Sequence, residues 1–175
     1  MTFGSTILRA TVGGLFVGHG LQKLTGAFEG PGLEGVTGMM QSLEMHPAKQ
    51  NAVAVASAET FGGAALALGV ATPAAGAALI ATMVTAVRKV HLRNGVWNSN
   101  GGWEFNAVMA AAVVAVASEG PGLISVDALF KRSRWGVAGG LFALLGGIAG
   151  SYAVTEYAKR QAPEAAADAA GEGAA

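Results

Sequence analysis

The sequence predicts an all-α membrane helix bundle, with a four-helix core followed by a fifth, C-terminal transmembrane helix. Apolar residues make up 52% of the 175 residues and charged residues only 13%, about half their share in an average soluble protein. Two long stretches, FNAVMAAAVVAVAS and GVAGGLFALLGGIAGS, carry no charge, whereas helices of a soluble bundle would each show a charged stripe. We therefore expect a multi-pass protein of the cell membrane that contacts the lipid bilayer.

Five segments are apolar enough to be membrane helices. A crossing takes about 20 residues, so the second and fifth are long enough, while the third and fourth are short unless polar side chains at their ends reach the headgroups. The fifth has KRSRW before it and tyrosines and basic residues at its far end, a belt typical of the membrane interface. The segments are 5–24, 51–71, 73–91, 104–118 and 135–157.

The segments divide the chain into three regions. We assign residues 1–128 to the four-helix core and 129–158 to the additional transmembrane helix. Residues 159–175 are expected to be disordered, because QAPEAAADAAGEGAA is acidic, rich in alanine and has nothing large to bury. The pentapeptide EGPGL follows a helical segment at 29–33 and again at 119–123, and its Gly-Pro-Gly centre predicts a turn.

Glycines recur at a spacing of four in the fifth segment, as Gly136 with Gly140 and as Gly146 with Gly150. Such pairs let a second helix approach closely. That helix can belong to the same chain, to a second copy in a homo-oligomer, or to another membrane or redox subunit. The sequence leaves these readings open.

Composition excludes several kinds of site. The chain has no cysteine, which excludes disulfides, thiolate nucleophiles, iron–sulfur clusters and thiol-bound zinc. No two of the other candidate ligands share a metal-ligand spacing, so no metal is expected. The 11 basic and 11 acidic side chains give zero net charge, which leaves no excess positive charge for nucleic acid.

Polar residues gather at one end of the predicted bundle. His19 and Lys23 lie four residues apart on one helical face, toward the end of the first segment. Glu59 lies about eight residues, or roughly 12 Å, inside the second. In antiparallel packing these positions share one side of the membrane with Arg88, His91, Trp103 and Glu104. Most basic residues also flank this side, which the positive-inside rule favours as cytoplasmic.

The strongest single candidate is Glu59, within AVAVASAETFGGAALALG. A carboxylate at this depth is costly unless it is protonated or held by a cation such as Lys23 or Arg88. One reading is a buried ion pair that fixes the register of the helices. The other is a carboxylate that handles protons or binds a ligand.

A quinone fits these residue types better than other cofactors do. Its carbonyl oxygens need donors and its ring needs an apolar or aromatic slot, so we expect cofactor binding by His19, Lys23, Arg88 and Trp103. Proton transfer, the catalytic part, is expected of Glu59, His91 and Glu104. Haem b would need two histidines on different helices, but their spacing gives it no support.

Five blocks in this order resemble the DoxX family of small bacterial membrane proteins: LRATVGGLFVGHGLQKLTG, ASAETFGGAALALGVATP, VRKVH, GGWEFN and EGPGLISVD. The resemblance covers roughly residues 5–128. It implies a four-helix bundle in the bacterial inner membrane, and the fifth segment and acidic tail depart from the shortest family pattern. The positions that match the family's polar pattern are Arg9, Lys23, Glu59, His91, Glu104, Ser125 and Asp127.

The resemblance also implies a redox context. The family includes membrane partners of thiosulfate:quinone oxidoreductases and members proposed to work with superoxide dismutase and a sulfurtransferase. We therefore expect a quinone-interacting membrane subunit of an oxidoreductase complex linked to sulfur compounds or oxidative stress. The alternative is a non-catalytic membrane scaffold or small-solute carrier, in which the buried ionic cluster fixes packing or lines a path.

Overall fold

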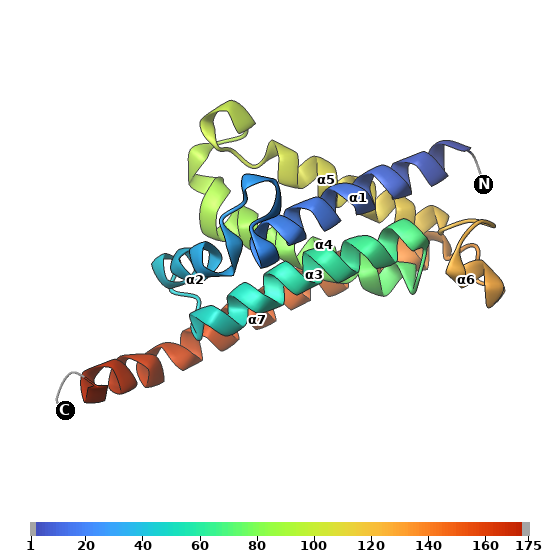
Figure 1. The fold of residues 1–175 in the computed structure, drawn as a ribbon. Helices are drawn as coiled ribbons and strands as arrows, with labels where there is room; N and C mark the ends of the chain where they lie inside the picture. The colour runs from blue at the N-terminus through green and yellow to red at the C-terminus, as the bar shows by residue number, and fades with distance from the viewer. Residues whose placement is uncertain (1–2, 173–175) are drawn as a thin grey trace.

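The computed structural model describes residues 3–172, with side chains over 4–162, and within that range every regular element is helical. Five long helices lie along the molecule, and each runs in the opposite direction to the long helix before it in the chain (Figure 1). They are α1 (Phe3–Thr25), α3 (Ala48–Leu68), α4 (Thr72–Ala86), α5 (Glu104–Glu119) and α7 (Gly136–Glu172). The shorter elements are η1 (Ala27–Glu29), α2 (Gly32–Ser42), η2 (Val87–His91), η3 (Leu92–Asn94), η4 (Asn98–Asn100) and α6 (Val126–Leu129).

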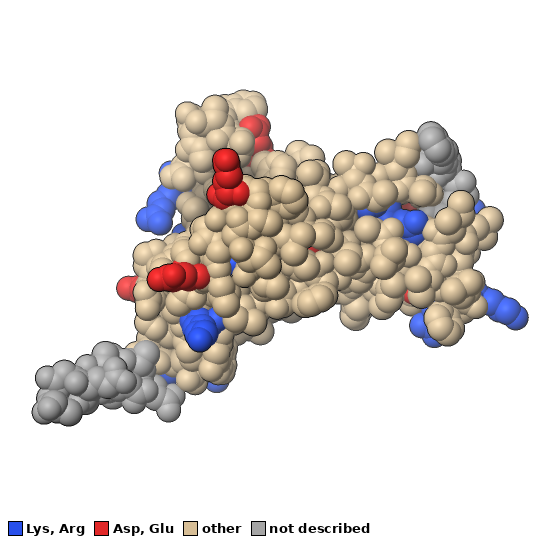
Figure 2. Space-filling model, in the orientation of Figure 1, with Lys and Arg blue, Asp and Glu red and all other residues tan. Residues whose placement is uncertain are grey.

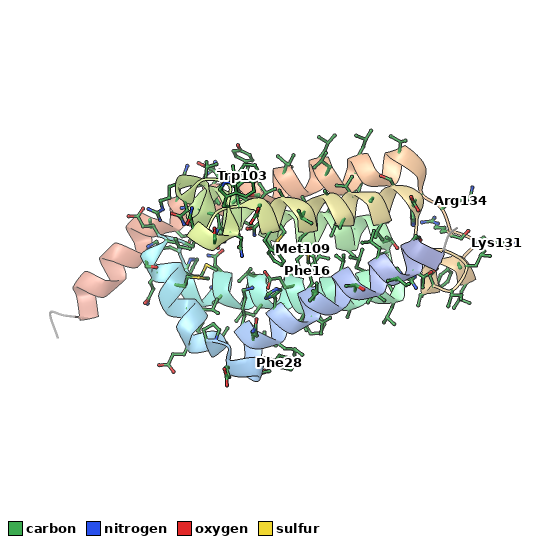
Figure 3. The ribbon with its side chains drawn as sticks, turned by 90° about the horizontal axis from the view of Figure 1, so that it is seen from above. Phe16, Phe28, Trp103, Met109, Lys131 and Arg134 are labelled. Carbon is green, nitrogen blue, oxygen red and sulfur yellow. The ribbon has the colours of Figure 1, made fainter. Side chains whose placement is uncertain are left out.

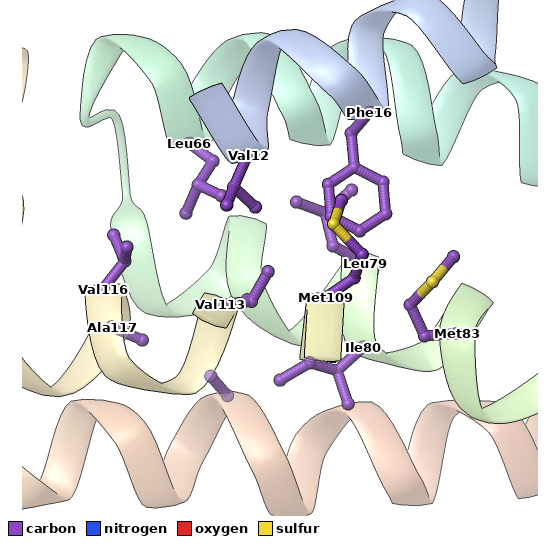
Figure 4. Close-up of a cluster of buried hydrophobic side chains, with 11 residues drawn as sticks. Val12, Phe16, Leu66, Leu79, Ile80, Met83, Met109, Val113, Val116 and Ala117 are labelled. Carbon is purple, nitrogen blue, oxygen red and sulfur yellow. The ribbon is translucent and has the colours of Figure 1, made fainter. Parts of the chain in front are cut away.

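Four of the long helices form a closed ring. Helix α1 packs on α3, α3 on α4, α4 on α5, and α5 returns to α1, while α7 lies outside the ring against α4 and α5. Buried apolar side chains from all five helices fill the centre (Figure 4). They are Val12, Phe16, Leu66, Leu79, Ile80, Met83, Met109, Val113, Val116, Ala117 and Ala143. The predicted fold class, a four-helix core with a fifth helix added, is confirmed.

Within the described residues, three helices are long and apolar enough to cross a membrane: Ala48–Leu68, Thr72–Asn94 and Gly136–Ala162. Charged side chains on the face shown in Figure 2 gather toward the two ends of the molecule. The third predicted segment is longer than expected, because a π turn and a 3₁₀ turn continue α4 without a break from Ala86 to Asn94. Helix α5 stays short, at 16 residues. The chain is a multi-pass membrane protein.

The acidic tail begins as a continuation of α7, and the disorder expected for it stays a prediction. Helix α7 continues without interruption to Glu172, so helix covers most of the region from residue 159 onward, and only residues 173–175 lie outside the described part. Alanine has the highest helix propensity of all residues, which accounts for the extension. At 37 residues the helix is about 55 Å long.

Helix α2 was not predicted from the sequence, because the residues between the first two predicted segments have the composition of a polar loop. Its residues Val36 and Met40 are buried with Met45, Ala52 and Ala158 in a second apolar cluster at the polar end of the bundle. The spacing of Val36 and Met40 places both on one face of a helix. A helical face in GLEGVTGMMQS was therefore the available signal.

The small residues of α7 pack inside the protein. A Cβ added at Gly146 or Gly150 would lie 3.3 Å from Ala77 or Ala81 of α4, and one at Gly147 would lie 2.5 Å from two side-chain carbons of Ile80. Gly140 lies against Ser118 of α5 in the same way. Three of the four predicted glycines therefore serve packing within the chain, while Gly136 has open space around it.

We expect Gly147→Leu to separate α7 from α4, because Ile80 is fully buried and has no room to move. The cost in unfolding free energy should be about 1–3 kcal/mol, as for other overpacked cores. Thermal unfolding of the detergent-purified protein measures it. Ala149→Leu, an exposed position on the same helix, is the matched control and should unfold like the wild type; equal losses for both variants would contradict this packing.

Candidate functional site

Glycines bring α1 and α3 into backbone contact. A Cβ at Gly13 would lie 2.6 Å from the carbonyl oxygen of Gly63, and one at Gly20 would overlap Thr60. Because glycine presents only a hydrogen at these points, the two helices cross closely. This close crossing sets the distance between the polar side chains that the two helices carry.

Lys23 and Glu59 form an ion pair across this crossing, between Nζ and Oε2. Glu59 is 3% exposed, whereas 22% of the Lys23 side chain is exposed. The carboxylate is therefore enclosed, and the lysine connects it to the surface. Of the two cations named for Glu59, the structure selects Lys23.

His19 lies one turn before Lys23 on the same face of α1. Its Nδ1 lies 3.2 Å from Oε1 of Gln22, and its ring meets that of Phe105 of α5 edge to face, with centroids 6.0 Å apart. Since one ring nitrogen is engaged by Gln22, the other is left for a further partner. His19, Lys23, Glu59 and Phe105 form what we call the α1–α3 site.

Arg88 lies elsewhere in the bundle. Its Nη1 donates to the hydroxyls of Ser151 at 3.0 Å and Thr155 at 3.2 Å, and its guanidinium lies 3.7 Å from the ring centre of Tyr152. All three partners belong to α7. Arg88 therefore joins α4 to α7 and does not join the α1–α3 site.

His91 is the last residue of η2, Trp103 precedes α5 and Glu104 is the first residue of α5, so these three residues flank the segment that joins α4 to α5. Nδ1 of His91 lies 2.7 Å from the carbonyl oxygen of Gly101, and Glu104 accepts a 2.7 Å hydrogen bond from the backbone N–H of Asn98. The backbone N–H of Trp103 donates to Gly95. All the predicted site residues thus lie at one end of the bundle, as expected, but they fall into three groups. His19, Lys23 and Glu59 come together in one site. Arg88 lies apart from them, and so does the third group, formed by His91, Trp103 and Glu104.

A second polar cluster lies at the opposite end, where the sequence reading expected no site. Arg9 is 5% exposed and donates from Nη1 to the carbonyl of Pro121 and from Nη2 to that of Ile124, both at 2.8 Å. Figure 3 shows this end of the molecule, with Lys131 and Arg134 labelled on it. The EGPGLISVD block that carries the resemblance supplies both carbonyls, and was the signal for this cluster.

Asp127 of the same cluster caps the first turn of α4. Its carboxylate accepts from the N–H groups of Ala71 at 2.7 Å and Thr72 at 3.0 Å, from the Thr72 hydroxyl at 2.8 Å and from the Trp135 indole at 3.2 Å. Burial alone would raise the pKa of Asp127, but the hydrogen bonds from Thr72, Ala71 and Trp135 outweigh it and hold the pKa below its ordinary value of 3.8.

Among the residues that the structure describes, no three histidine or acidic side chains lie close enough together to hold a metal ion. The chemistry available at the α1–α3 site is therefore that of an ammonium, a carboxylate and an imidazole beside an aromatic ring.

A family model described as DoxX matches residues 4–92, just over half of the chain. The chain belongs to the DoxX family. The match runs from the start of α1 through η2, so Arg9, Lys23, Glu59 and His91 lie within it, while helices α5 and α7 lie beyond it. Searches of curated proteins and of solved structures each returned no match.

For this DoxX-family chain we expect Asp127→Asn to lower the thermal stability at pH 7. We also expect the stability of the variant to fall less than that of the wild type when the pH is lowered. Because the folded pKa is depressed, the stability that Asp127 contributes is complete above the ordinary aspartate value and is lost as pH falls through the folded pKa. The loss at pH 7 should be about 1–3 kcal/mol.

Thermal unfolding at pH 7 and at several pH values below about 4 measures both effects. Glu119→Gln is the matched control, since Glu119 is exposed at the same end of the bundle, and it should keep the wild-type profile. An Asp127→Asn variant with the wild-type loss of stability in acid would contradict the role of this carboxylate.

Proposed function

We propose that this chain is the quinone-interacting membrane subunit of an oxidoreductase complex, with its quinone site beside α1 and α3. The observation that carries the proposal is the buried carboxylate of Glu59, paired with a lysine that reaches the surface. Ionisable groups are costly in membrane helices, and those that are kept there usually bind ligands or move protons.

The side chains around the ion pair fit a quinone ring. His19 and Lys23 can donate to its carbonyl oxygens, and Phe105, 39% exposed, offers an aromatic surface next to His19. Val108 is exposed on the same helix, three residues further along, which gives an isoprenoid tail an apolar surface along the bundle. Donors, a ring surface and access from lipid therefore occur together.

A bound quinone would supply a carrier of two electrons and two protons. The chain's own part is to hold a proton at the pair formed by Lys23 Nζ and Glu59 Oε2, with His19 as the second group able to exchange one. Because the chain has no cysteine, we propose that its electron donor is another subunit, one that acts on sulfur compounds or in oxidative stress.

The second candidate is a membrane scaffold, and the closed ion pair favours it. Lys23 and Glu59 join α1 to α3, while Arg88 joins α4 to α7, so both contacts can serve packing alone. Removal of one partner from a buried ion pair destabilises a protein by about 3–5 kcal/mol, because the other charge is left unpaired. Replacement of both partners by uncharged side chains often changes the stability little.

The double variant Lys23→Met/Glu59→Gln separates the two candidates. It removes both charges, so we expect it to insert and to unfold near the wild-type temperature, whereas Lys23→Met alone leaves Glu59 unpaired and should be destabilised. A short-chain quinone analogue should raise the unfolding temperature of the wild type and have no effect on the double variant. Organic extracts of the purified wild type should contain menaquinone or ubiquinone.

Lys49→Met is the matched control, because Lys49 is exposed at the same end of the bundle, and it should keep the response to quinone. The quinone proposal would be wrong if the extract of the wild type held no quinone and the analogue did not change its unfolding temperature. The scaffold would then be the supported function. A double variant that still responds to the analogue would move the quinone site away from Lys23 and Glu59.

A further inference from the structure

A pocket of about 350 Å³ lies at the end of α4, within the helical turns that continue it. It is lined by Arg88, Lys89, Val90, Leu92 and Arg93. Three of its five lining residues are basic. The pocket shares no residue with the α1–α3 site.

The cations of this pocket come from the irregular end of the membrane-crossing helix. A π turn, η2 (Val87–His91), carries Arg88 and Lys89, and a 3₁₀ turn, η3 (Leu92–Asn94), carries Arg93. The lining of the pocket includes side chains from both turns. The two arginines therefore lie beside one cavity although they belong to different turns.

The positive charge of the pocket has no acidic partner among the side chains of residues 4–162. The three ion pairs found there, Lys23–Glu59, Lys159–Glu156 and Arg160–Glu156, involve none of its residues.

Neutral groups fix two of the cations. Arg88 is held by hydroxyls and the Tyr152 ring, and Lys89 donates to the carbonyl of Leu43 at 3.1 Å. The pocket thus presents cations that are positioned in advance and not neutralised.

The position of the pocket along the membrane normal and its lining residues indicate which kind of anion fits it. It lies at the last turns of the membrane-crossing helix Thr72–Asn94, the level of the lipid headgroups. Leu92, which is 60% exposed, and Val90 add apolar surface beside the cations. An anion with an apolar attachment matches both features, and arginine binds phosphate oxygens with two parallel hydrogen bonds.

We propose that this pocket binds a phosphate ester, the headgroup of an anionic phospholipid in the leaflet that faces the polar end of the bundle. Three basic side chains line the pocket, and each basic residue near an anionic membrane surface gains about 1 kcal/mol from the lipid headgroups. The positive-inside rule favours the cytoplasmic side for this end, which is also the side where anionic lipids attract basic residues. The shared chemistry is the phosphate, and a soluble phosphate compound is the competing source.

The test measures thermal unfolding of the full chain in mixed micelles that contain phosphatidylglycerol, phosphatidylcholine or inorganic phosphate. We expect saturable stabilisation by phosphatidylglycerol, little by phosphatidylcholine and little by inorganic phosphate. Arg93→Gln should weaken the apparent affinity for phosphatidylglycerol about fivefold, the equivalent of one basic residue at an anionic surface. Since Arg93 is exposed, this variant should fold normally, and its stability without lipid should match that of the wild type.

Arg134→Gln is the matched control, because Arg134 is exposed at the opposite end (Figure 3) and should leave the affinity unchanged. Equal stabilisation by phosphatidylglycerol and phosphatidylcholine would overturn the proposal. An equal loss of affinity in Arg134→Gln would also overturn it, because general surface charge would then explain the binding. Stabilisation by inorganic phosphate as strong as that by phosphatidylglycerol would assign the pocket to a soluble phosphate compound and overturn the lipid assignment.

Discussion

The close crossing of α1 and α3, which brings Lys23 to Glu59, is the constraint on which the arrangement of the first half of the chain depends. A carboxylate that is 3% exposed needs a cation at hand. Only a close crossing of α1 and α3 brings the lysine near enough, and glycines on both helices permit that crossing. Replacing Gly20 with any larger residue would meet Thr60 next to Glu59, so the backbone contact and the charge pairing form one unit.

Helix α4 occupies the middle of the bundle, and polar contacts fix both of its ends. Asp127 caps its first turn, and Arg88, just past its last residue, holds it to α7. Between these ends the packing is apolar, with Leu79 and Ile80 fully buried. Because a bilayer offers no water to satisfy polar groups at depth, the polar contacts that set the position of the helix lie near its ends.

Hydropathy was sufficient to predict the five long helices, and antiparallel order was sufficient to predict that His19, Glu59, Arg88 and Glu104 share one end. The partner of each polar group was not predictable, because the choice between Lys23 and Arg88 for Glu59 depends on which helix faces which. The sequence also gave no sign of the π turn at η2, since hydropathy does not distinguish it from an α-helical turn. The family resemblance named Arg9 and Asp127 as polar positions, but it did not name their partners, because the hydrogen bonds to Pro121 and Thr72 join segments that are far apart in the sequence.

The position of α7 decides which side of the bundle remains open to other proteins. It covers α4 and α5 and is joined to α5 by residues 120–135, which include α6. A tethered helix competes at a high effective concentration that a separate protein rarely matches. The chain therefore carries its own occupant for that surface, and α1 and α3, which the ion pair of Lys23 and Glu59 joins, lie on the side that α7 does not cover.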